Sequence, residues 1–547
     1  MITRSVLLLM FAAMATVSCQ RNAPKKQPVV RDTTHYTQEE YISLTLDSNL
    51  LNSYLARDTQ YAEYIRDFYR RRDFHFAWIN ESGVTEQAGS FINMMGTDAS
   101  YGIAAADSVL QATFDTLSAR GDRLRPSDTT IPRAELQMTA RFFHYASKTW
   151  GGLTSDKARD LEWYIPRKKI DMGSLLDSVV ATKSGNMAGK EPVNRQYNLL
   201  RERLAKLSAQ EGKGWDSIKA DKKTYKKGDS ARVVSDVKAR LLVLGDLQQQ
   251  DASPLFDVAL DSAIRTFQAR HGLTVNGQLN QSTLNALNVS PARRIRQILV
   301  NMERIRWVPV DPGGNYILVN IPEFRMHIYE NDKLAWSSNV VVGTPANSTV
   351  IFSREMKYVV FAPYWNVPPG ILGSEVLPGI KRSTGYLARH NMEVAGASGN
   401  VISPGSINWS KYTARNFPYI IRQKPGGANS LGKVKFLFPN EYNIYLHDTP
   451  SKGLFNETKR SFSHGCIRVS EPKRLAMYLL RNDSAWTEKR IDAAMNATKE
   501  QYVTLKYKLP VFIGYFTAWV GSDGQLNFRD DVYGHDAKLA VMLFGKS

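Results

Sequence analysis

Three patterns of hydrophobic and polar positions follow one another along the chain. Up to about residue 220, apolar residues recur at helical spacing among charged ones, most clearly over 54–72 and 137–149. Residues 226–289 hold shorter helical repeats, and 291–308 hold one more. Beyond residue 315 the period changes to two, as in half-buried strands. The pattern predicts a multi-domain α+β protein with a helical scaffold, a small helical bundle and a β-rich C-terminal domain.

The small bundle is predicted from three amphipathic segments separated by turn residues. Helices are expected over 234–245, 256–273 and 281–287, with Asn276-Gly277 in the loop before the third. No cluster of residues suited to catalysis occurs in the helical region before it.

Alternating or continuous apolar runs predict the strands of the C-terminal domain, over 316–321, 324–328, 336–342, 357–362, 433–438 and 509–520. Between them, a Gly-, Ser- and Lys-rich stretch at about 371–432 lacks a clear period. Such a stretch is either a lid-like insertion or an inert surface excursion.

The N-terminus has the pattern of a secretory signal. Residues 1–18 combine Arg4 with a short apolar run, which is too short to span a membrane. Thr16-Val17-Ser18-Cys19 resembles a bacterial lipobox, so Cys19 is either lipidated or an incidental cysteine after ordinary cleavage. The polar, basic segment 19–36 reads as a tether. The expected location is the periplasm or cell envelope, with possible anchoring to the outer membrane.

Charge and cysteine content narrow the function. A net charge of +19 indicates either a basic surface that only keeps the protein soluble or a surface that binds an anionic partner. No zinc-finger spacing or RNA-binding motif favours nucleic acid. If Cys19 is lipidated, Cys466 is the one thiol left in an oxidising compartment, where an unpaired cysteine suggests a chemical role.

The densest polar cluster surrounds Cys466. Tyr445-Leu446-His447-Asp448 precedes Ser463-His464-Gly465-Cys466-Ile467-Arg468, so two histidines flank the thiol in sequence. An imidazole activates a thiol by taking its proton. A metal site is not expected, because there is no second nearby cysteine and no HExxH motif.

Each neighbour of the cysteine has an expected place. His464 would share a strand face with Cys466, while His447 would approach from another strand. Amides beside Gly465 would hold an oxyanion. A helix capped near Ser470 would lower the pKa of the thiol. Arg468 would either bind a substrate carboxylate or pair with Asp448.

The string from His447-Asp448-Thr449-Pro450 to Ser463-His464-Gly465-Cys466-Ile467-Arg468-Val469 resembles the YkuD-type L,D-transpeptidases, with the first histidine nineteen residues before the cysteine. Thr349-Val350 departs from the usual Thr-Pro of that family. Ala263-Ile264-Arg265-Thr266-Phe267-Gln268 with His271-Gly272-Leu273 resembles a peptidoglycan-binding domain. The whole resembles the large YcbB-like subclass and divides as signal 1–18, tether 19–36, scaffold 37–225, binding bundle 226–289, linker helix 290–314 and catalytic domain 315–547.

The resemblance implies a function for these residues. Cys466 would be the nucleophile and His447 the base, acting on the third residue of a tetrapeptide stem, with release of D-Ala and formation of 3-3 cross-links. Ser463, His464, Gly465, Arg468 and Tyr445 would shape the site. The sequence does not identify a third member of a triad, for which a backbone carbonyl near Tyr445 is one candidate. No cofactor is implied. The alternatives are a carboxypeptidase, a transferase that anchors a protein, and a noncatalytic wall-binding lipoprotein.

Overall fold

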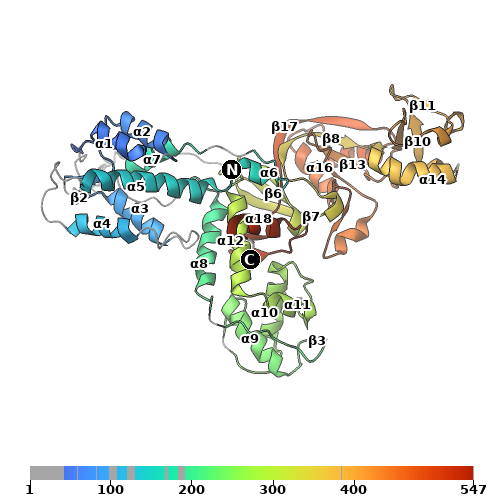
Figure 1. Cartoon of the computed structure of the whole chain (residues 1–547). Helices are drawn as coiled ribbons and strands as arrows, with labels where there is room; N and C mark the ends of the chain where they lie inside the picture. Colours follow the sequence, from blue (N-terminus) through green and yellow to red (C-terminus); the bar gives the residue numbers. More distant parts are fainter. Residues whose placement is uncertain are drawn as a thin grey trace, which may run out of the picture.

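A computed structural model describes residues 42–545, apart from 58–59, 82, 98–107, 120–129, 167–169, 183–190, 213, 250 and 384. The expected signal, the tether and Cys19 lie outside the described residues. Within the described part of the chain, no helix is both long and apolar enough to cross a bilayer. The molecule has a helical arm, a small helical bundle and a β-rich domain that meet near one long helix, α12 (Figure 1).

The helical arm is built around a long central helix, α5 (Figure 1), most of whose residues are buried. Its elements are α1 Ser48–Leu55, α2 Ala62–Arg71, β1 Ile79–Asn80, β2 Gly83–Val84, α3 Glu86–Thr97, α4 Ser108–Ala119, α5 Thr130–Ala146, α6 Ser155–Arg159, α7 Met172–Val180 and α8 Arg195–Ser208. The prediction of one helical stretch over 54–72 is wrong, because α1 ends at Leu55 and α2 begins at Ala62. The predicted 137–149 lies within α5 and the π-helical turn Ser147–Gly151 that follows it.

A buried carboxylate organises the core of this arm. Glu135, on α5, accepts hydrogen bonds from the Ala77 amide at 2.6 Å, the Trp78 amide at 3.0 Å and the Tyr69 hydroxyl at 2.8 Å. Burial raises the pKa of Glu135 to about 7, against the opposing effect of these donors. A raised pKa favours the protonated form in the fold, so the stability this group supplies falls as the pH rises through 7.

Replacing Glu135 by alanine should destabilise the arm by about 3 kcal/mol or more, because three buried donors lose their acceptor. Thermal unfolding followed by near-ultraviolet circular dichroism measures the change. The matched control is Glu202→Ala at an exposed position of α8, which should stay within about 0.5 kcal/mol of the parent. Equal melting temperatures for the two variants would contradict the assigned role of Glu135.

The small bundle has the predicted helical character. Its elements are β3 Thr224–Tyr225, α9 Arg232–Leu244, α10 Val258–Arg270, β4 Leu279–Asn280 and α11 Gln281–Leu287. Asp257 caps α10 and Asn280 caps α11 through their side-chain oxygens. The helices share one apolar core that includes Val237, Leu260 and Phe267.

Helix α12, Pro291–Ile305, joins the other parts of the molecule. It begins at a Ser290 cap with proline in its first turn, an arrangement that suits a helix start. Ile298 and Met302 pack into the core of the helical arm, whereas Val300 packs into the core of the β-rich domain. The helix is therefore shared by two cores, which fixes the arm against the domain.

The β-rich domain contains a sheet that closes on itself. In order across the sheet, its described strands are β15 Ser461–Ser463, β7 Lys333–Gly343, β16 Ile467–Val469, β14 Leu446–His447, β13 Val434–Leu437, β8 Ser353–Phe361, β17 Gln501–Gly514, β5 Tyr316–Asn320 and β6 Arg325–Glu330. Closure follows because β7 pairs with β6 through its first half and with β16 through its second. Helices α16 Pro472–Leu480, α17 Glu488–Met495 and α18 His535–Phe544 contribute side chains to the core of the domain. The expected α+β class is confirmed.

The last predicted strand, 509–520, is wrong in its extent. Strand β17 begins at Gln501 and ends at Gly514, and a separate hairpin follows, β18 Ala518–Val520 with β19 Leu526–Phe528. Ala518, Val520 and Phe528 pack into the core of the helical arm. The hairpin therefore packs against the helical arm, although it follows the last long strand of the β-rich domain in sequence.

The stretch between β8 and β13 folds as a unit with its own core. It holds β9 Trp365–Asn366, α13 Pro369–Ile371, α14 Leu377–Arg382, α15 Tyr386–Arg389, β10 Met392–Ala395, β11 Val401–Ile402 and β12 Ile420–Gln423. The strands form a sheet in the order β11-β10-β12-β9, and the apolar residues form a separate cluster. This unit lies at the end of the molecule opposite the helical arm (Figure 1).

Candidate active site

Two adjacent parallel strands bring His447 and Cys466 to one face of the sheet. Strand β14 pairs with β16 so that Leu446 lies beside Ile467, and the Ile467 amide donates to the Tyr445 carbonyl at 3.1 Å. Leu446 and Ile467 are fully buried in the core. Because side chains alternate along a strand, Tyr445 and His447 point to the other face, beside Cys466.

The His447 ring is held in one tautomer. It is 4% exposed, and its Nδ1 donates to the carbonyl oxygen of Asp448 at 2.5 Å. Burial, followed by the charge of Arg468, lowers the pKa of His447 to about 4. At neutral pH the imidazole is therefore uncharged, and its Nε2 carries a lone pair that can accept a proton.

Asp448 is fixed by contacts that exclude the expected pair with Arg468. Its carboxylate accepts from the Lys433 amide at 2.9 Å and the Thr449 amide at 2.7 Å, and pairs with the Lys452 ammonium. Of the two roles considered for Arg468, the ion pair with Asp448 is absent from the described residues, and Arg468 Nε is buried without an acceptor there. Lys452, four residues beyond Asp448, is the cation that pairs with this carboxylate.

The Cys466 thiol lies against Tyr445. The thiol reaches the Asn443 carbonyl at 3.5 Å, and both the amide and the hydroxyl of Tyr445 hydrogen-bond to the sulfur. Burial nevertheless raises the pKa of the Cys466 thiol above its ordinary value, outweighing these donors and the charge of Arg468. At neutral pH the Cys466 side chain is thus a thiol, on the sheet face that also holds the neutral imidazole of His447.

The expectation that a helix end lowers the pKa of this thiol is wrong. Helix α16 begins at Pro472 with Glu471 at the cap position and no side-chain cap. The Ser470 hydroxyl pairs instead with the Ser338 hydroxyl at 2.9 Å. Burial of the sulfur is the largest influence on its pKa and raises it.

The loop before Cys466 breaks the strand, so His464 does not share a strand face with Cys466 as predicted. Strand β15 ends at Ser463, Gly465 takes φ +110°, and His464 is exposed. The Ser463 hydroxyl donates to the Cys466 carbonyl at 2.6 Å and accepts from the Gly465 amide at 3.2 Å. Within the described residues, no acceptor pairs with the Cys466 amide. That amide stands beside the sulfur.

Two residues that sequence reasoning missed support this loop. The Thr349 hydroxyl donates to the Gly465 carbonyl at 2.8 Å and accepts from the Gly343 amide at 2.9 Å. The Tyr533 hydroxyl donates to the Gly343 carbonyl at 2.7 Å and accepts from the Thr349 amide at 3.3 Å. The departure at Thr349-Val350 drew attention to this loop, but nothing in the sequence linked Tyr533 to it.

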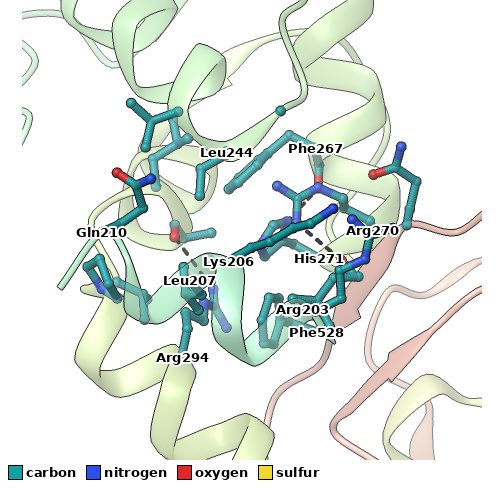
Figure 2. A pocket seen from close by; sticks show the side chains of 18 of the residues that line it. Arg203, Lys206, Leu207, Gln210, Leu244, Phe267, Arg270, His271, Arg294 and Phe528 are labelled. Carbon is teal, nitrogen blue, oxygen red and sulfur yellow. Dashed lines mark hydrogen bonds between the residues drawn. The ribbon is translucent and has the colours of Figure 1, made fainter. Parts of the chain in front are cut away.

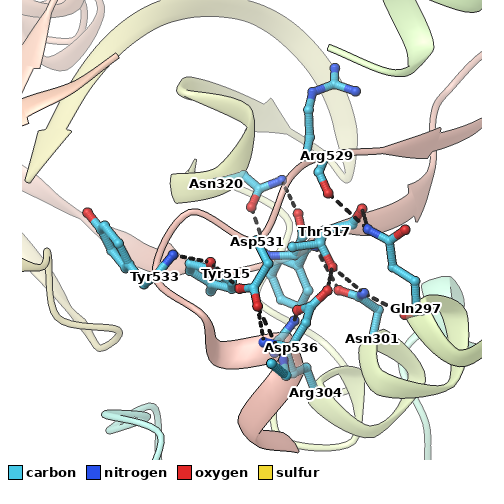
Figure 3. Close-up of polar contacts among 12 residues, drawn as sticks. Gln297, Asn301, Arg304, Asn320, Tyr515, Thr517, Arg529, Asp531, Tyr533 and Asp536 are labelled. Atoms are coloured by element: carbon cyan, nitrogen blue, oxygen red, sulfur yellow. Dashed lines mark hydrogen bonds and ion pairs between the residues drawn. The ribbon is translucent and has the colours of Figure 1, made fainter. Parts of the chain in front are cut away.

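A network of polar contacts connects Tyr533 to helix α12 (Figure 3). The Tyr533 amide donates to the Tyr515 hydroxyl at 2.8 Å, which donates to Asp531 at 2.6 Å. In the same network, Arg304 of α12 pairs with Asp536 at 2.5 Å. A continuous set of polar contacts therefore ties the shared helix to the loop that carries the thiol.

Three known families match successive parts of the chain. Residues 63–204 match the scaffold domain, 231–287 match the "Putative peptidoglycan binding domain", and 314–489 match the L,D-transpeptidase catalytic domain named YkuD. The chain carries a YkuD L,D-transpeptidase catalytic domain. His447 and Cys466 both lie inside that matched range. Among the described residues, no group of three or more His, Cys, Asp or Glu side chains is placed to hold a metal ion.

Two curated proteins are similar to parts of the chain. A Haemophilus influenzae protein named "Putative L,D-transpeptidase" is 35% identical over 244 residues, which are 45% of this chain and 49% of that protein. The chain thus spans about half the length of this relative. The N-acetylmuramoyl-L-alanine amidase CwlM of Mycobacterium tuberculosis is 36% identical over 75 residues, or 12% of this chain and 18% of the amidase.

Among solved structures, an L,D-transpeptidase from Stackebrandtia nassauensis is similar to this chain, with 12% sequence identity. The match covers 54% of this chain and 98% of that one, with a TM-score of 0.20. A similarity this low does not extend the assignment made from the sequence families.

Proposed function

We propose that the protein is a peptidoglycan L,D-transpeptidase that forms 3-3 cross-links through a thioester on Cys466. The observation that carries the proposal is a neutral His447, with its Nε2 free to accept a proton, on the sheet face that also holds the thiol. This is the arrangement of a nucleophile with its general base. The Asp448 carbonyl acts as the orienting third group, in place of the candidate carbonyl near Tyr445.

The first half of the reaction breaks an amide bond. As the Cys466 sulfur attacks the carbonyl of the third stem residue, His447 Nε2 takes the thiol proton. The carbonyl becomes a tetrahedral oxyanion, which the free Cys466 amide stabilises together with the Tyr445 hydroxyl. Burial keeps the pKa of Tyr445 above its ordinary range, so the hydroxyl remains a donor. When the intermediate collapses, His447 gives its proton to the leaving amine, and D-Ala departs.

The second half transfers the acyl group. The side-chain amine of an acceptor stem attacks the thioester, His447 takes the proton released by that amine, and the thiolate leaves and is reprotonated. Water in the acceptor position gives a carboxypeptidase, and a protein amine gives an anchored protein. Arg468, a cation without a carboxylate partner among the described residues, is suited to a carboxylate of the stem.

The other parts of the chain fit an envelope enzyme. The bundle at 231–287 matches a domain described as peptidoglycan binding, and a net charge of +19 favours a carboxylate-bearing polymer. We also propose a periplasmic location with Cys19 as the site of lipidation. Peptidoglycan stems and glycan, together with the membrane through that anchor, are the proposed partners.

Mass spectrometry of the protein incubated with disaccharide-tetrapeptide tests the function. We expect the parent protein to form dimers with loss of D-Ala. The Cys466→Ala and His447→Ala variants should form none. Loss of D-Ala without dimers would identify a carboxypeptidase or a missing protein acceptor. A folded, reduced protein that leaves the substrate unchanged would contradict the proposal and favour a noncatalytic wall-binding role.

Thr349 should act as a positioning residue for the Cys466 loop. Thr349→Val keeps the shape but leaves the Gly343 amide and Gly465 carbonyl without their partner, so kcat should fall about 10- to 100-fold. KM should change little, because Thr349 does not contact the substrate in this mechanism. Thr349→Ser keeps the hydroxyl and should restore most of kcat. A loss confined to KM, or no rescue by serine, would argue against positioning.

A further inference from the structure

A pocket of about 290 Å³ lies where three parts of the molecule meet (Figure 2), and Cys466 is not among the residues that line it. Helix α8 of the arm forms one side, the bundle forms another through the ends of α9 and α10, and α12 with the hairpin β18–β19 completes it. We refer to it as the junction pocket. No part of the mechanism above uses it.

The walls of the junction pocket are basic. Arg203, Lys206, Arg270 and Arg294 line it, and no acidic side chain is found among its described lining residues. Asp246, just outside, pairs with Arg270 and offsets one of these charges. Lys206 is exposed and has no ion-pair or hydrogen-bond partner in the described part of the chain. Three cations therefore face the hollow without a matching carboxylate.

An aromatic stack forms the floor between these cations. The His271 ring stacks on Phe267, with centroids 3.9 Å apart, and on Phe528 at 5.6 Å. The Arg294 guanidinium lies 4.4 Å from the centre of the Phe528 ring, and Arg270 lies 5.3 Å from that of Phe267. The pocket thus offers a flat apolar surface with a cation at each end.

The hydrogen-bond partners of Arg294 and His271 in the pocket are neutral groups. The Arg294 side chain donates to the Gln297 side chain at 2.9 Å and to the Ala286 carbonyl at 3.5 Å, both neutral acceptors. Burial and the charge of Arg270 lower the pKa of Arg294 to about 9. His271 donates from Nδ1 to the Phe267 carbonyl at 2.8 Å, and burial holds its pKa well below the ordinary value. The charge of Asp530 opposes the lowering of the Arg294 pKa, but no hydrogen bond or ion pair joins Asp530 to Arg294 in the described part of the chain. A bound carboxylate would therefore be the first anionic group to hydrogen-bond Arg294.

We propose that the junction pocket binds a carboxylate-bearing stem peptide of peptidoglycan, separately from the donor stem at Cys466. The cations match the carboxylates of a stem, the aromatic stack matches its alkyl portions, and the volume suits two or three residues rather than a whole strand of glycan. The choice of peptidoglycan as the source of the carboxylates rests on the proposed function. A phosphate would satisfy the same cations but leaves the aromatic floor unused.

Binding there would join three parts of the molecule. One ligand would contact α8, the bundle and the hairpin that continues from β17. Arg270 already bonds the Leu526 carbonyl at 3.2 Å, and Arg203 bonds the Gly524 carbonyl at 2.6 Å, so the hairpin is tied to both sides. A stem in the pocket would add to these ties and hold the catalytic domain in a fixed orientation on the wall.

Calorimetric titration of the full chain carrying Cys466→Ala with a disaccharide-tripeptide tests the proposal. The tripeptide lacks the fourth residue and cannot serve as a donor. Arg294→Gln should weaken binding about tenfold or more, since a charge-assisted hydrogen bond is lost, and Lys206→Gln about threefold to tenfold. Lys489→Gln, an exposed lysine on α17, is the matched control and should leave the affinity unchanged.

The outcomes separate the site from the proposed function. Lys206→Gln and Arg294→Gln proteins that melt normally and bind like the control would overturn the proposal. Displacement of the tripeptide by millimolar inorganic phosphate or by phosphatidylglycerol vesicles would also overturn it, in favour of a phosphate site. Tripeptide binding that is weakened by both variants would support the pocket as a stem-peptide site. If the protein with its native Cys466 formed no dimers from tetrapeptide, the site would stand while the proposed transpeptidase activity would be contradicted.

Discussion

Replacing Cys466 by serine should reduce the rate of acyl-enzyme formation by at least about 10⁴-fold, the scale seen when a nucleophile is removed. Serine fills nearly the same volume, and the contacts that hold the loop come from the Ser463 hydroxyl and the Thr349 hydroxyl, not from the sulfur. The loss would therefore be chemical, because a hydroxyl gives up its proton to a neutral imidazole far less readily than a thiol. Single-turnover mass spectrometry of the acylated protein measures it.

Two comparisons make the Cys466→Ser result specific. Cys466→Ala should lose as much activity, and both variants should melt within a few degrees of the parent, since the hydrogen bonds of the sulfur, with Tyr445 and at 3.5 Å with the Asn443 carbonyl, are weak ones. A serine variant that retained a tenth of the parent rate would place the nucleophile elsewhere in the chain.

The elements that rest on local pattern were predictable from the sequence. The helices of the bundle appear where apolar residues recur at helical spacing, and α12 begins at its Ser290-Pro291 start. The hairpin formed by β6 and β7 turns at Asn331-Asp332, both of which take positive φ. The spacing of His447 and Cys466 also pointed to a pair of neighbouring strands. Each of these depends on residues close together in the chain.

Features that depend on contacts between residues far apart in the sequence were not predictable. The pKa of Cys466 is raised by burial, which outweighs the hydrogen bonds from Tyr445 and the charge of Arg468. Likewise the ion-pair partner of Asp448 in the described residues is Lys452 and not Arg468. The Thr349 hydroxyl bonds Gly465 across 116 residues of the chain, and the Tyr533 hydroxyl bonds Gly343 across 190. Periodicity carries no information at such separations.

Hairpin β18–β19 shows the same limit in the fold. The apolar run 509–520 reads as one strand, since nothing in its period marks Gly514 as an end. The structure divides it because Asn320 bonds both the amide and the carbonyl of Phe516, which turns the chain out of the sheet. That turn also creates one wall of the junction pocket.

Replacing His447 by glutamine should slow acylation about 10²- to 10⁴-fold, the usual contribution of a general base. Glutamine can still donate to the Asp448 carbonyl, so the loop should keep its shape while the proton acceptor is lost. In the parent, the pKa of His447 is lowered to about 4, which means that the ring binds a proton only at low pH. Acylation should therefore stay level from about pH 8 down to about pH 5 and fall as the pH drops through 4.

Alkylation of Cys466 by iodoacetamide provides an independent measure of the resting state. Because burial raises the pKa of the thiol, alkylation should be slow at pH 7 and should rise only in the alkaline range above the ordinary thiol pKa. His447→Gln should leave this alkaline limb nearly unchanged, because a neutral imidazole does not stabilise a thiolate. Rapid alkylation at pH 5 that disappears in His447→Gln would instead require a thiolate paired with a protonated imidazole. In that case the proton would already have moved before the substrate arrives, and the acid limb near pH 4 would belong to the thiol and not to His447.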